Sequence, residues 1–569
     1  MIGAFYGARG SCLRKLLNRK NPMPRDRRAM RVPLCALLLL VPGVGHAQAT
    51  PSADTAAPKG TLLPPAAAAT TAPPAPPPAP VPTPPPPPPP TLTGRLLDDV
   101  KEVIDSNGRS PGAPPEEKIA PPPPNHEGTF EFGSYGRVQI ASDLRGGTGR
   151  TANIVAYGTR IDEDSYAELE LRREDTFADG IKNKVVTTLG LFPPFFQFTG
   201  NAIQNIGLRN LYDQATYGPL TLWVGSRMYR GDDIYLLDWW PLDNQNTVGG
   251  GIGGNLPATS IGETQIAFHV GMERLDNPAQ FEQIPVVAPF GAGTTNVTIL
   301  DRPRLTETLK ITQLVRNSKV AHPFDDDDRG FKFILYGAAQ EMSAGVFTDT
   351  TVGTANNTQT PYPSETGFLI GGELGYWTGK RDTFIQIFAR YAHGLAAYDP
   401  LSEPVTFDAN RTTNGANEAL FAIGGNYEKG AFGLLYGAYF RYFTDGDPQP
   451  SSIQTYDEGT IDVRPQVFIG EHWGIAVDGS YQARRYAELD PTTNAPLNAS
   501  EWRGGIIPYF SPSGRGSYKR PQLRVIYAIT ARNEGARALY AAQDAFSQRS
   551  VEHYLGLGVE WWFNSSSYP

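Results

Sequence analysis

The segment from His553 to Phe563 constrains the fold of this chain more than any other stretch. Large apolar residues occupy its odd positions from Leu555 onward, whereas the even positions up to Glu560 are polar or small. A period of two is typical of a β-strand with one apolar and one polar face. An aromatic-ended strand of this kind at the C-terminus is typical of the last strand of a transmembrane β-barrel. Trp562 breaks the alternation, and in such a barrel its ring would point into the lumen.

The N-terminal residues 1–49 indicate a secreted protein. A basic segment precedes the apolar segment 32–45, and Ala47-Gln48-Ala49 fits a signal-peptidase site, so we expect a signal peptide together with an upstream segment. Both cysteines, Cys12 and Cys35, lie there, so the mature chain needs no disulfide. Because residues 1–49 carry a net charge of +8 and the whole chain −8, the mature chain carries −16, which argues against nucleic acid as a partner.

Residues 50–127 are rich in proline and alanine, with an unbroken proline run from Pro84 to Pro90. Such composition favours extended polyproline II over a packed core. The apolar spacing at about 93–106 predicts one short amphipathic helix. We expect a periplasmic linker with the cell wall within its reach; a mostly disordered spacer is the alternative.

From residue 128 onward, alternating segments rich in aromatic residues are separated by turn clusters. Residues 128–563 number 436, which gives about 24–27 residues per strand and turn if the barrel has 16 to 18 strands. We therefore predict an all-β fold, a transmembrane antiparallel β-barrel of 18 strands with 16 as the alternative, over 128–563. Residues 564–569 would form a short tail.

Several motifs in this region resemble the maltoporin family. A W-x-G-x-R-x-Y pattern runs from Trp223 to Tyr229, and a D-I-x-x-x-D-W pattern runs from Asp233 to Trp239. The remaining anchors follow in the family's order: Tyr135 to Arg137, Tyr166 to Leu169, Arg520 to Val525 and Glu560 to Phe563. The resemblance implies an 18-stranded homotrimeric barrel in the outer membrane. It also implies passive uptake of maltodextrins along an aromatic slide flanked by charged groups.

The resemblance assigns individual residues to that path. The aromatic slide and constriction would comprise Tyr135, Tyr166, Trp240, Tyr518 and Trp562. The polar track would comprise Arg137, Glu168, Arg209, Arg230, Asp233 and Asp238. Some positions depart from the family pattern: Tyr518 replaces a tryptophan, Gly231 replaces an arginine next to Arg230, and Pro241 stands where an aromatic residue continues the motif. The aromatic ring that a neighbouring subunit would add is sought among Phe195, Phe196 and Phe198.

The chemistry of these residue types is consistent with a sugar path. Aromatic rings stack on the apolar face of a glucose ring, and charged bidentate groups bond its hydroxyls. We therefore predict an outer-membrane porin for maltodextrins or similar oligosaccharides, surrounded by lipid, with its N-terminal extension in the periplasm. The alternative is a general porin, or one selective for another sugar or a small anion. We expect no enzyme, cofactor or metal site, because no nucleophile–base or metal-ligand spacing stands out.

Overall fold

The computed structural model describes residues 127–193, 206–259, 262–274, 279–288, 293–316, 328–349, 358–379, 382–399, 404, 407–447, 455–489 and 494–565. The expected signal peptide, the linker helix at 93–106 and the candidates Phe195, Phe196 and Phe198 lie outside the described residues. Within this part of the chain, no helix is both long enough and apolar enough to cross a membrane.

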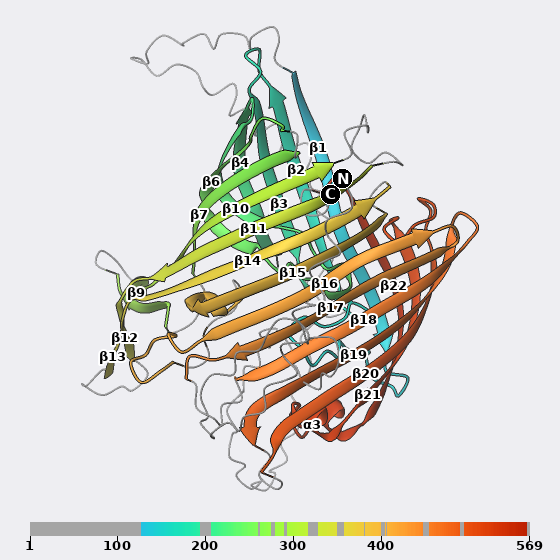
Figure 1. The fold of residues 1–569 in the computed structure, drawn as a ribbon. Coiled ribbons are helices and arrows are strands. Elements are labelled where there is room, and N and C mark those ends of the chain that lie inside the picture. Colours follow the sequence, from blue (N-terminus) through green and yellow to red (C-terminus); the bar gives the residue numbers. More distant parts are fainter. Residues whose placement is uncertain are drawn as a thin grey trace, which may run out of the picture. The chain divides into compact units, whose positions relative to one another are not determined.

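Eighteen antiparallel strands form one sheet, and Figure 1 shows them running obliquely around a barrel. The sheet closes because β1 (Glu127–Ser142) pairs with both β2 (Tyr166–Thr176) and β22 (Val551–Phe563). The predicted all-β barrel is thus confirmed, with 18 strands rather than 16. The other wall strands are β3 (Lys182–Leu191), β4 (Ile206–Tyr217), β5 (Leu220–Arg230), β6 (Asn244–Asn255), β7 (Glu263–Glu273), β10 (Arg304–Arg316), β11 (Arg329–Met342), β14 (Glu365–Thr378), β15 (Thr383–Gly394), β16 (Asn417–Lys429), β17 (Phe432–Thr444), β18 (Tyr456–Ile469), β19 (Trp473–Leu489), β20 (Pro496–Phe510) and β21 (Gln522–Arg532).

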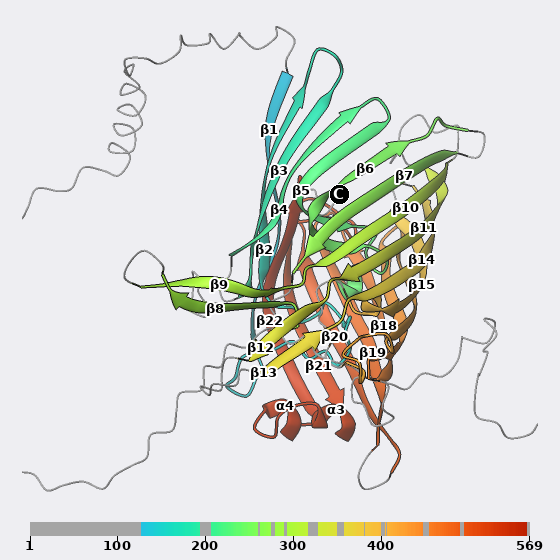
Figure 2. The ribbon, with the colours of Figure 1, turned by 90° about the vertical axis from the view of Figure 1, so that its left-hand side faces the viewer.

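Smaller elements lie in the connections between wall strands. Figure 2 shows one hairpin, β8 with β9, projecting from the wall, and two short helices, α3 and α4, at one end of the barrel. The bounds of these elements are β8 (Phe281–Val287), β9 (Thr294–Asp301), β12 (Gly345–Asp349), β13 (Thr358–Tyr362), η3 (Tyr235–Leu237), η4 (Leu395–Ala397), α3 (Glu534–Ala538) and α4 (Ala545–Gln548).

The two ends of the barrel differ in the length of their connections. At the end where β1 begins and β22 finishes, the connections include two-residue turns at 218–219 and 430–431. We call this the short-turn end. At the opposite end the connections include 143–165, 395–416 and 533–550, and we call it the long-loop end.

The wall alternates as the sequence pattern predicts. On β2, Leu169 and Leu171 are exposed outside the barrel, whereas Glu168 and Glu170 are buried inside it. Leu555 and Leu557 on β22 are likewise exposed. An apolar outer face around a polar interior is the arrangement that a barrel needs in lipid.

Several of the buried interior charges are held in ion pairs between neighbouring strands. Glu418 accepts hydrogen bonds from Arg390 and from Arg441, and Arg441 also lies 3.5 Å from Glu458. Arg484 donates to the other oxygen of Glu458 at 2.9 Å. Because an unpaired buried charge is costly, this chain of pairs lets the wall carry arginines inside the barrel.

Candidate functional site

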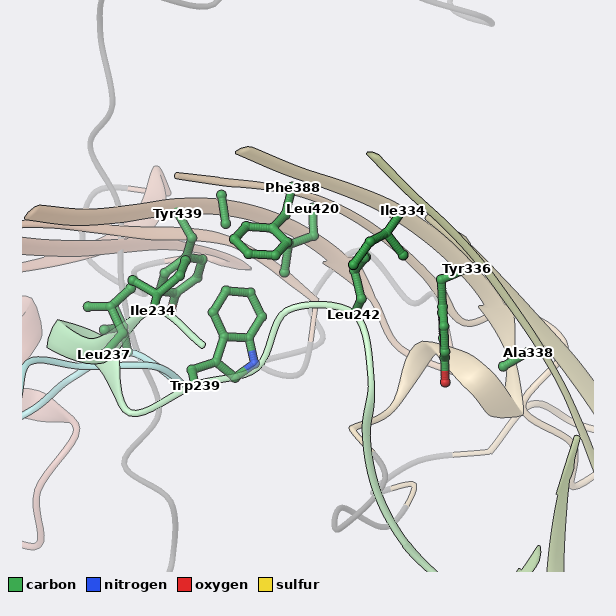
Figure 3. Close-up of a cluster of buried hydrophobic side chains, with 12 residues drawn as sticks. Ile234, Leu237, Trp239, Leu242, Ile334, Tyr336, Ala338, Phe388, Leu420 and Tyr439 are labelled. Carbon is green, nitrogen blue, oxygen red and sulfur yellow. The ribbon is translucent and has the colours of Figure 1, made fainter. Parts of the chain in front are cut away.

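The connection between β5 and β6, residues 231–243, folds into the barrel, and we call it the inner loop. A tight turn shapes it: the Ile234 N–H donates to the Trp239 carbonyl at 2.8 Å, and Asp238 adopts a left-handed conformation with φ of 46°. Figure 3 shows apolar side chains of this loop packed against the inner wall. The loop contributes Ile234, Leu237, Trp239 and Leu242, and the wall contributes Ile334, Tyr336, Ala338, Phe388, Leu420 and Tyr439.

Two glycines let the inner loop approach the wall closely. A Cβ added at Gly424 would lie 2.9 Å from the Ile234 side chain, and one at Gly437 would lie 2.8 Å from it. Both distances are shorter than ordinary contacts allow. The inner loop is therefore seated in a shaped apolar recess and narrows the bore as a fixed element.

The connection between β1 and β2, residues 143–165, also enters the barrel and locks the inner loop. Its Tyr157 ring lies parallel to Trp239 with centroids 4.0 Å apart, and Tyr439 meets both rings edge-on or tilted. The neighbouring Trp240 turns elsewhere and lies under Arg230, whose guanidinium is 3.7 Å from the ring centroid. The two adjacent tryptophans thus have different tasks: Trp239 anchors the loop, and Trp240 holds an arginine of the expected polar track.

A row of aromatic rings begins near the long-loop end. Phe192 follows β3, and its ring centroid lies 5.6 Å from that of Tyr166 at the start of β2. Tyr166 lies 6.1 Å from Tyr135 on β1. Phe192 and Tyr166 are half-buried, whereas Tyr135 is fully buried, so only the first two rings present surface to the bore.

The row continues toward the short-turn end. Tyr135 is the register partner of Trp562 on β22. The Trp562 ring lies 6.4 Å from Tyr518, which in turn lies 6.0 Å from Phe384 on β15. These last three rings are half-buried. We call the whole set the aromatic row: Phe192, Tyr166, Tyr135, Trp562, Tyr518 and Phe384.

Tyr135 acts in this structure through its hydroxyl group. Arg137 Nη1 and Arg160 Nη2 each donate to the Tyr135 hydroxyl oxygen at 2.7 Å. The same two arginines face Asp238 of the inner loop, at 3.4 Å and 3.9 Å. A wall tyrosine, two arginines and a loop aspartate therefore meet inside the barrel, where the two inserted loops face β1.

Glu560 on β22 is a second centre of charge beside the aromatic row. It accepts hydrogen bonds from Arg160 at 3.1 Å, Arg520 at 2.8 Å and Arg524 at 2.5 Å. The Tyr235 hydroxyl donates to it at 2.9 Å. Arg160 also pairs with Glu163 at 2.9 Å, whereas Arg520 and Arg524 share Glu560 alone among the described residues, which leaves a local excess of positive charge.

Arg520 and Tyr235 also contact the row itself. The Arg520 guanidinium lies 4.2 Å from the centroid of the Trp562 ring. Tyr235 packs edge-on against Tyr518 and Trp562, with centroids 5.4 Å and 6.2 Å away. The part of the row nearer the short-turn end is therefore lined by the ring of Tyr235 and by the planar guanidinium of Arg520.

Two of the remaining polar-track residues, Arg209 and Glu168, contact Tyr166, whereas Arg230 contacts Trp240 and Asn244. Arg209 Nε donates to the Tyr166 hydroxyl at 2.8 Å, and that hydroxyl donates to Glu168 at 2.5 Å. Arg230 donates to Asn244 at 2.9 Å. Two further loop carboxylates meet wall lysines, since Asp243 pairs with Lys310 and Asp232 with Lys332. The inner loop thus presents carboxylates to cations on several strands.

The carboxyl groups of the two inserted loops differ in pKa. Burial opposes ionisation of Asp238, but the charges of Arg160, Arg137 and Arg230 prevail and lower its pKa to about 2. Burial raises the pKa of Asp233 to about 6, against the effect of Arg160 and helped by Asp238 and Asp232. Burial also raises the pKa of Glu163 to about 7, although Arg137 and Arg160 oppose it.

Several site residues escaped the sequence prediction. Arg160 and Tyr235 come from loops without periodic pattern, and only the fold brings them to Glu560. Glu560 itself follows the inward parity of β22 and could have been chosen on that ground. Phe192 lies close before the segment in which the missing ring was sought. Phe384 lies on β15, within the alternating region from residue 128 onward, and neither the resemblance nor a motif singled it out.

Comparison with known proteins supplies the context for this geometry. A family model described as LamB porin matches residues 130–563. No curated protein matches the chain significantly. Similar solved structures include OpdL of Pseudomonas aeruginosa (10% identity, 77% of this chain and 99% of that one, TM-score 0.37). They also include OccAB1 of Acinetobacter baumannii (11%, 77% and 96%, 0.35) and OmpT of Vibrio cholerae in a trimer form (12%, 77% and 99%, 0.32).

Proposed function

The chain belongs to the LamB porin family and is thus an outer-membrane porin, and we propose that it admits maltodextrins or similar oligosaccharides by passive diffusion. The single observation that carries this proposal is the aromatic row, which runs from Phe192 near the long-loop end to Phe384 at the short-turn end. Ring faces bind the apolar face of a sugar ring at any position along a chain. A succession of such faces lets an oligosaccharide move from one weak site to the next.

The charged groups beside the row support the same proposal. Arg209 and Glu168 flank Tyr166, and Arg137 and Asp238 lie where the row is interrupted by the buried Tyr135. Paired donors and acceptors can exchange their mutual bonds for bonds to sugar hydroxyls at small net cost. We assign stacking to the half-buried rings and hydrogen bonding to these pairs, with Tyr135 positioning Arg137 and Arg160.

Orientation and assembly are part of the proposal. Outer-membrane barrels have short periplasmic turns and long outer loops, so the short-turn end would face the periplasm, together with the N-terminal extension. A homotrimer is expected from the family resemblance. Single-channel recording tests the assembly, because three coupled conductance steps per insertion are expected of a trimer and single steps would contradict it.

The transport proposal is tested by planar-bilayer current with maltodextrins of increasing length. We expect saturable block, and we expect Trp562→Ala to weaken it about five- to ten-fold through the loss of one stacking face. Trp561→Ala is the matched control, because Trp561 is the adjacent residue on the opposite face of β22. Current that is unaffected by every sugar at high concentration would overturn the proposal.

One observation favours the alternative of a small-anion or differently selective porin. Arg520 and Arg524 share the single carboxylate of Glu560 and have no other ion-pair partner among the described residues, which gives this part of the bore an excess of positive charge. Liposome swelling with neutral sugars and with sugar acids of equal size separates the two functions. Faster entry of the acids would favour the alternative.

A further inference from the structure

A separate cavity lies at the long-loop end, away from the aromatic row. It has a volume of about 330 Å³ and lies between the β1–β2 loop and the β21–β22 loop. Arg150 and Asp544 contribute from the two loops, Phe546 from α4, and Glu552 and Tyr554 from β22. The transport path described above uses none of these five residues. We call this space the outer cavity.

An aromatic ring and an ion pair stand together in the outer cavity. Arg150 donates to both carboxylate oxygens of Asp544, at 3.1 Å and 2.6 Å. The Arg150 guanidinium lies 4.1 Å from the centroid of Phe546, and Arg532 lies 4.0 Å from the same centroid. A planar donor group, a carboxylate and a ring edge are therefore available within one small space.

Glu552 contributes to the outer cavity a carboxylate that can accept a further hydrogen bond. Its side chain is 6% exposed, and its Oε1 accepts no hydrogen bond from any described residue, although Arg549 lies 3.6 Å away. The Tyr554 hydroxyl donates to Gln139 at 3.0 Å. A buried carboxylate oxygen without a hydrogen bond is costly, so a ligand hydroxyl that donates to it would be favoured.

The charge of the lining identifies the class of ligand. Four carboxylates, those of Asp143, Asp162, Asp544 and Glu552, line the outer cavity with the single arginine Arg150. Each carboxylate pairs with an arginine: Asp143 and Glu552 with Arg549, Asp162 with Arg503, and Asp544 with Arg150, so the lining is close to neutral overall. A neutral polyol, which can donate to the carboxylates and accept from the arginine, suits such a lining better than an ion does. The volume lies at the lower end of ligand pockets, about 300–1,000 Å³, and suits one sugar ring rather than a chain.

The position of the outer cavity relates it to transport. Tyr554 and Trp562 lie on the same face of β22, because their positions differ by eight, an even number. Eight residues correspond to about 26 Å along the strand. A sugar ring bound at Tyr554 would thus be held on the strand that carries Trp562, on the long-loop side of the aromatic row.

We propose that the outer cavity is a docking site for a single neutral hexose ring, which captures a sugar before it reaches the aromatic row. This inference rests on the proposed function and extends it with a second site. A docking site of this kind raises the rate of capture from one side of the membrane only. It does not alter how long a sugar stays on the row.

Sided addition of maltotriose in a planar bilayer tests the proposal. Phe546→Leu removes the ring but keeps apolar volume, and Glu552→Gln removes the carboxylate. We expect each variant to lower the association rate from the long-loop side about five-fold, as expected for one lost ring contact in Phe546→Leu and one lost hydrogen bond to a carboxylate in Glu552→Gln. The association rate from the short-turn side and the residence time should not change. Arg145→Ala is the control, because Arg145 is exposed on the same loop and does not line the outer cavity.

The outcomes separate this proposal from the transport proposal. Unaltered association rates in both variants, each with normal conductance without sugar, would overturn the docking site and leave transport intact. If no sugar blocks the wild-type channel, transport fails, and glucose binding to the purified full chain is then measured by saturation-transfer NMR. Loss of the glucose signal in Glu552→Gln would still support the docking site, and an unaltered or absent wild-type signal would overturn it.

Discussion

The rings of Tyr157 and Trp239 lie face to face, with centroids 4.0 Å apart and planes 15° apart, although the two residues belong to different loops. Tyr439 of the wall contacts both rings, at 5.3 Å and 5.5 Å. This contact fixes two inserted loops to each other and to β17. The position of the inner loop inside the barrel is therefore set by apolar packing, and this packing also holds the charged residues that the loop carries.

Removing the Trp239 ring should release the inner loop. Truncation of a buried tryptophan to alanine costs about 3–5 kcal/mol. Here we expect this loss to weaken the attachment of the inner loop and to leave the barrel wall stable. We expect Trp239→Ala to insert normally but to show larger single-channel conductance and greater open-channel noise. Tyr157→Phe is the control, because it keeps the stacked ring and loses only the hydroxyl bond to Asp399. Equal noise in both variants would contradict the anchoring role.

The ion selectivity of the channel should depend on pH. Asp233 and Glu163 have pKa values raised to about 6 and about 7, whereas that of Asp238 is lowered to about 2. Lowering the pH from about 7.5 to about 5 therefore neutralises the first two carboxylates and leaves Asp238 charged. The bore loses negative charge, so anion selectivity should rise on acidification. Reversal potentials in a KCl gradient measure this shift.

A double variant identifies the groups responsible. Asp233→Asn with Glu163→Gln should show, already at neutral pH, the higher anion selectivity that the wild type reaches only at acidic pH. Its reversal potential should then change little with pH. A full wild-type pH response in the double variant would assign the titration to other groups.

The barrel wall was predictable from the sequence because the alternation of apolar and polar residues can be read from neighbouring positions in the chain. Each barrel strand has lipid on one face and the interior on the other, so residues such as Leu557 and Glu560 are sorted by parity alone. The same parity, with the family motifs, placed Trp562 and Tyr135 on the inner face. Parity does not predict how exposed an inward-facing side chain is. Tyr135 is fully buried because Arg137 and Arg160 converge on its hydroxyl.

The inserted loops were not predictable for the opposite reason. Tyr157, Arg160 and Tyr235 lie in segments without periodicity, where the position of each side chain depends on partners far away in the chain. Arg160 reaches Glu560 across 400 residues, and Tyr235 reaches it across 325. Contacts of this range leave no trace in residue spacing, so the charged centre around Glu560 emerged only from the fold.

The outer face of the barrel offers a stability test at Gly136. A Cβ at this position would lie 2.2 Å from the Trp561 ring, which covers the glycine from the adjacent strand. Gly136→Ala should displace that ring and its bond to Ser134, at a cost of about 1–3 kcal/mol. Thermal unfolding of the native oligomer on semi-native gels measures the loss. Gly479→Ala is the control, because nothing lies within 4 Å of its added Cβ.

The interior ion pairs offer a sharper test at Glu418. This fully buried carboxylate accepts from Arg390 at 2.7 Å and 3.1 Å and from Arg441 at 2.5 Å. Glu418→Gln leaves the charge of Arg390 without its carboxylate, since Arg390 Nη1 otherwise bonds only the neutral Pro241 carbonyl among the described residues. Breaking one partner of a buried pair costs about 3–5 kcal/mol.

Urea unfolding in lipid vesicles measures this cost. Asp457→Asn provides the comparison, because Asp457 pairs with the exposed Arg485 and surface pairs contribute only about 0–1 kcal/mol. We expect a loss at Glu418 several times that at Asp457, together with increased current noise, because Arg390 also holds the inner loop at Pro241. Equal losses of unfolding free energy at the two positions would show that water reaches the interior ion pairs freely. The ion pairs of β15 to β17 would then not count as buried.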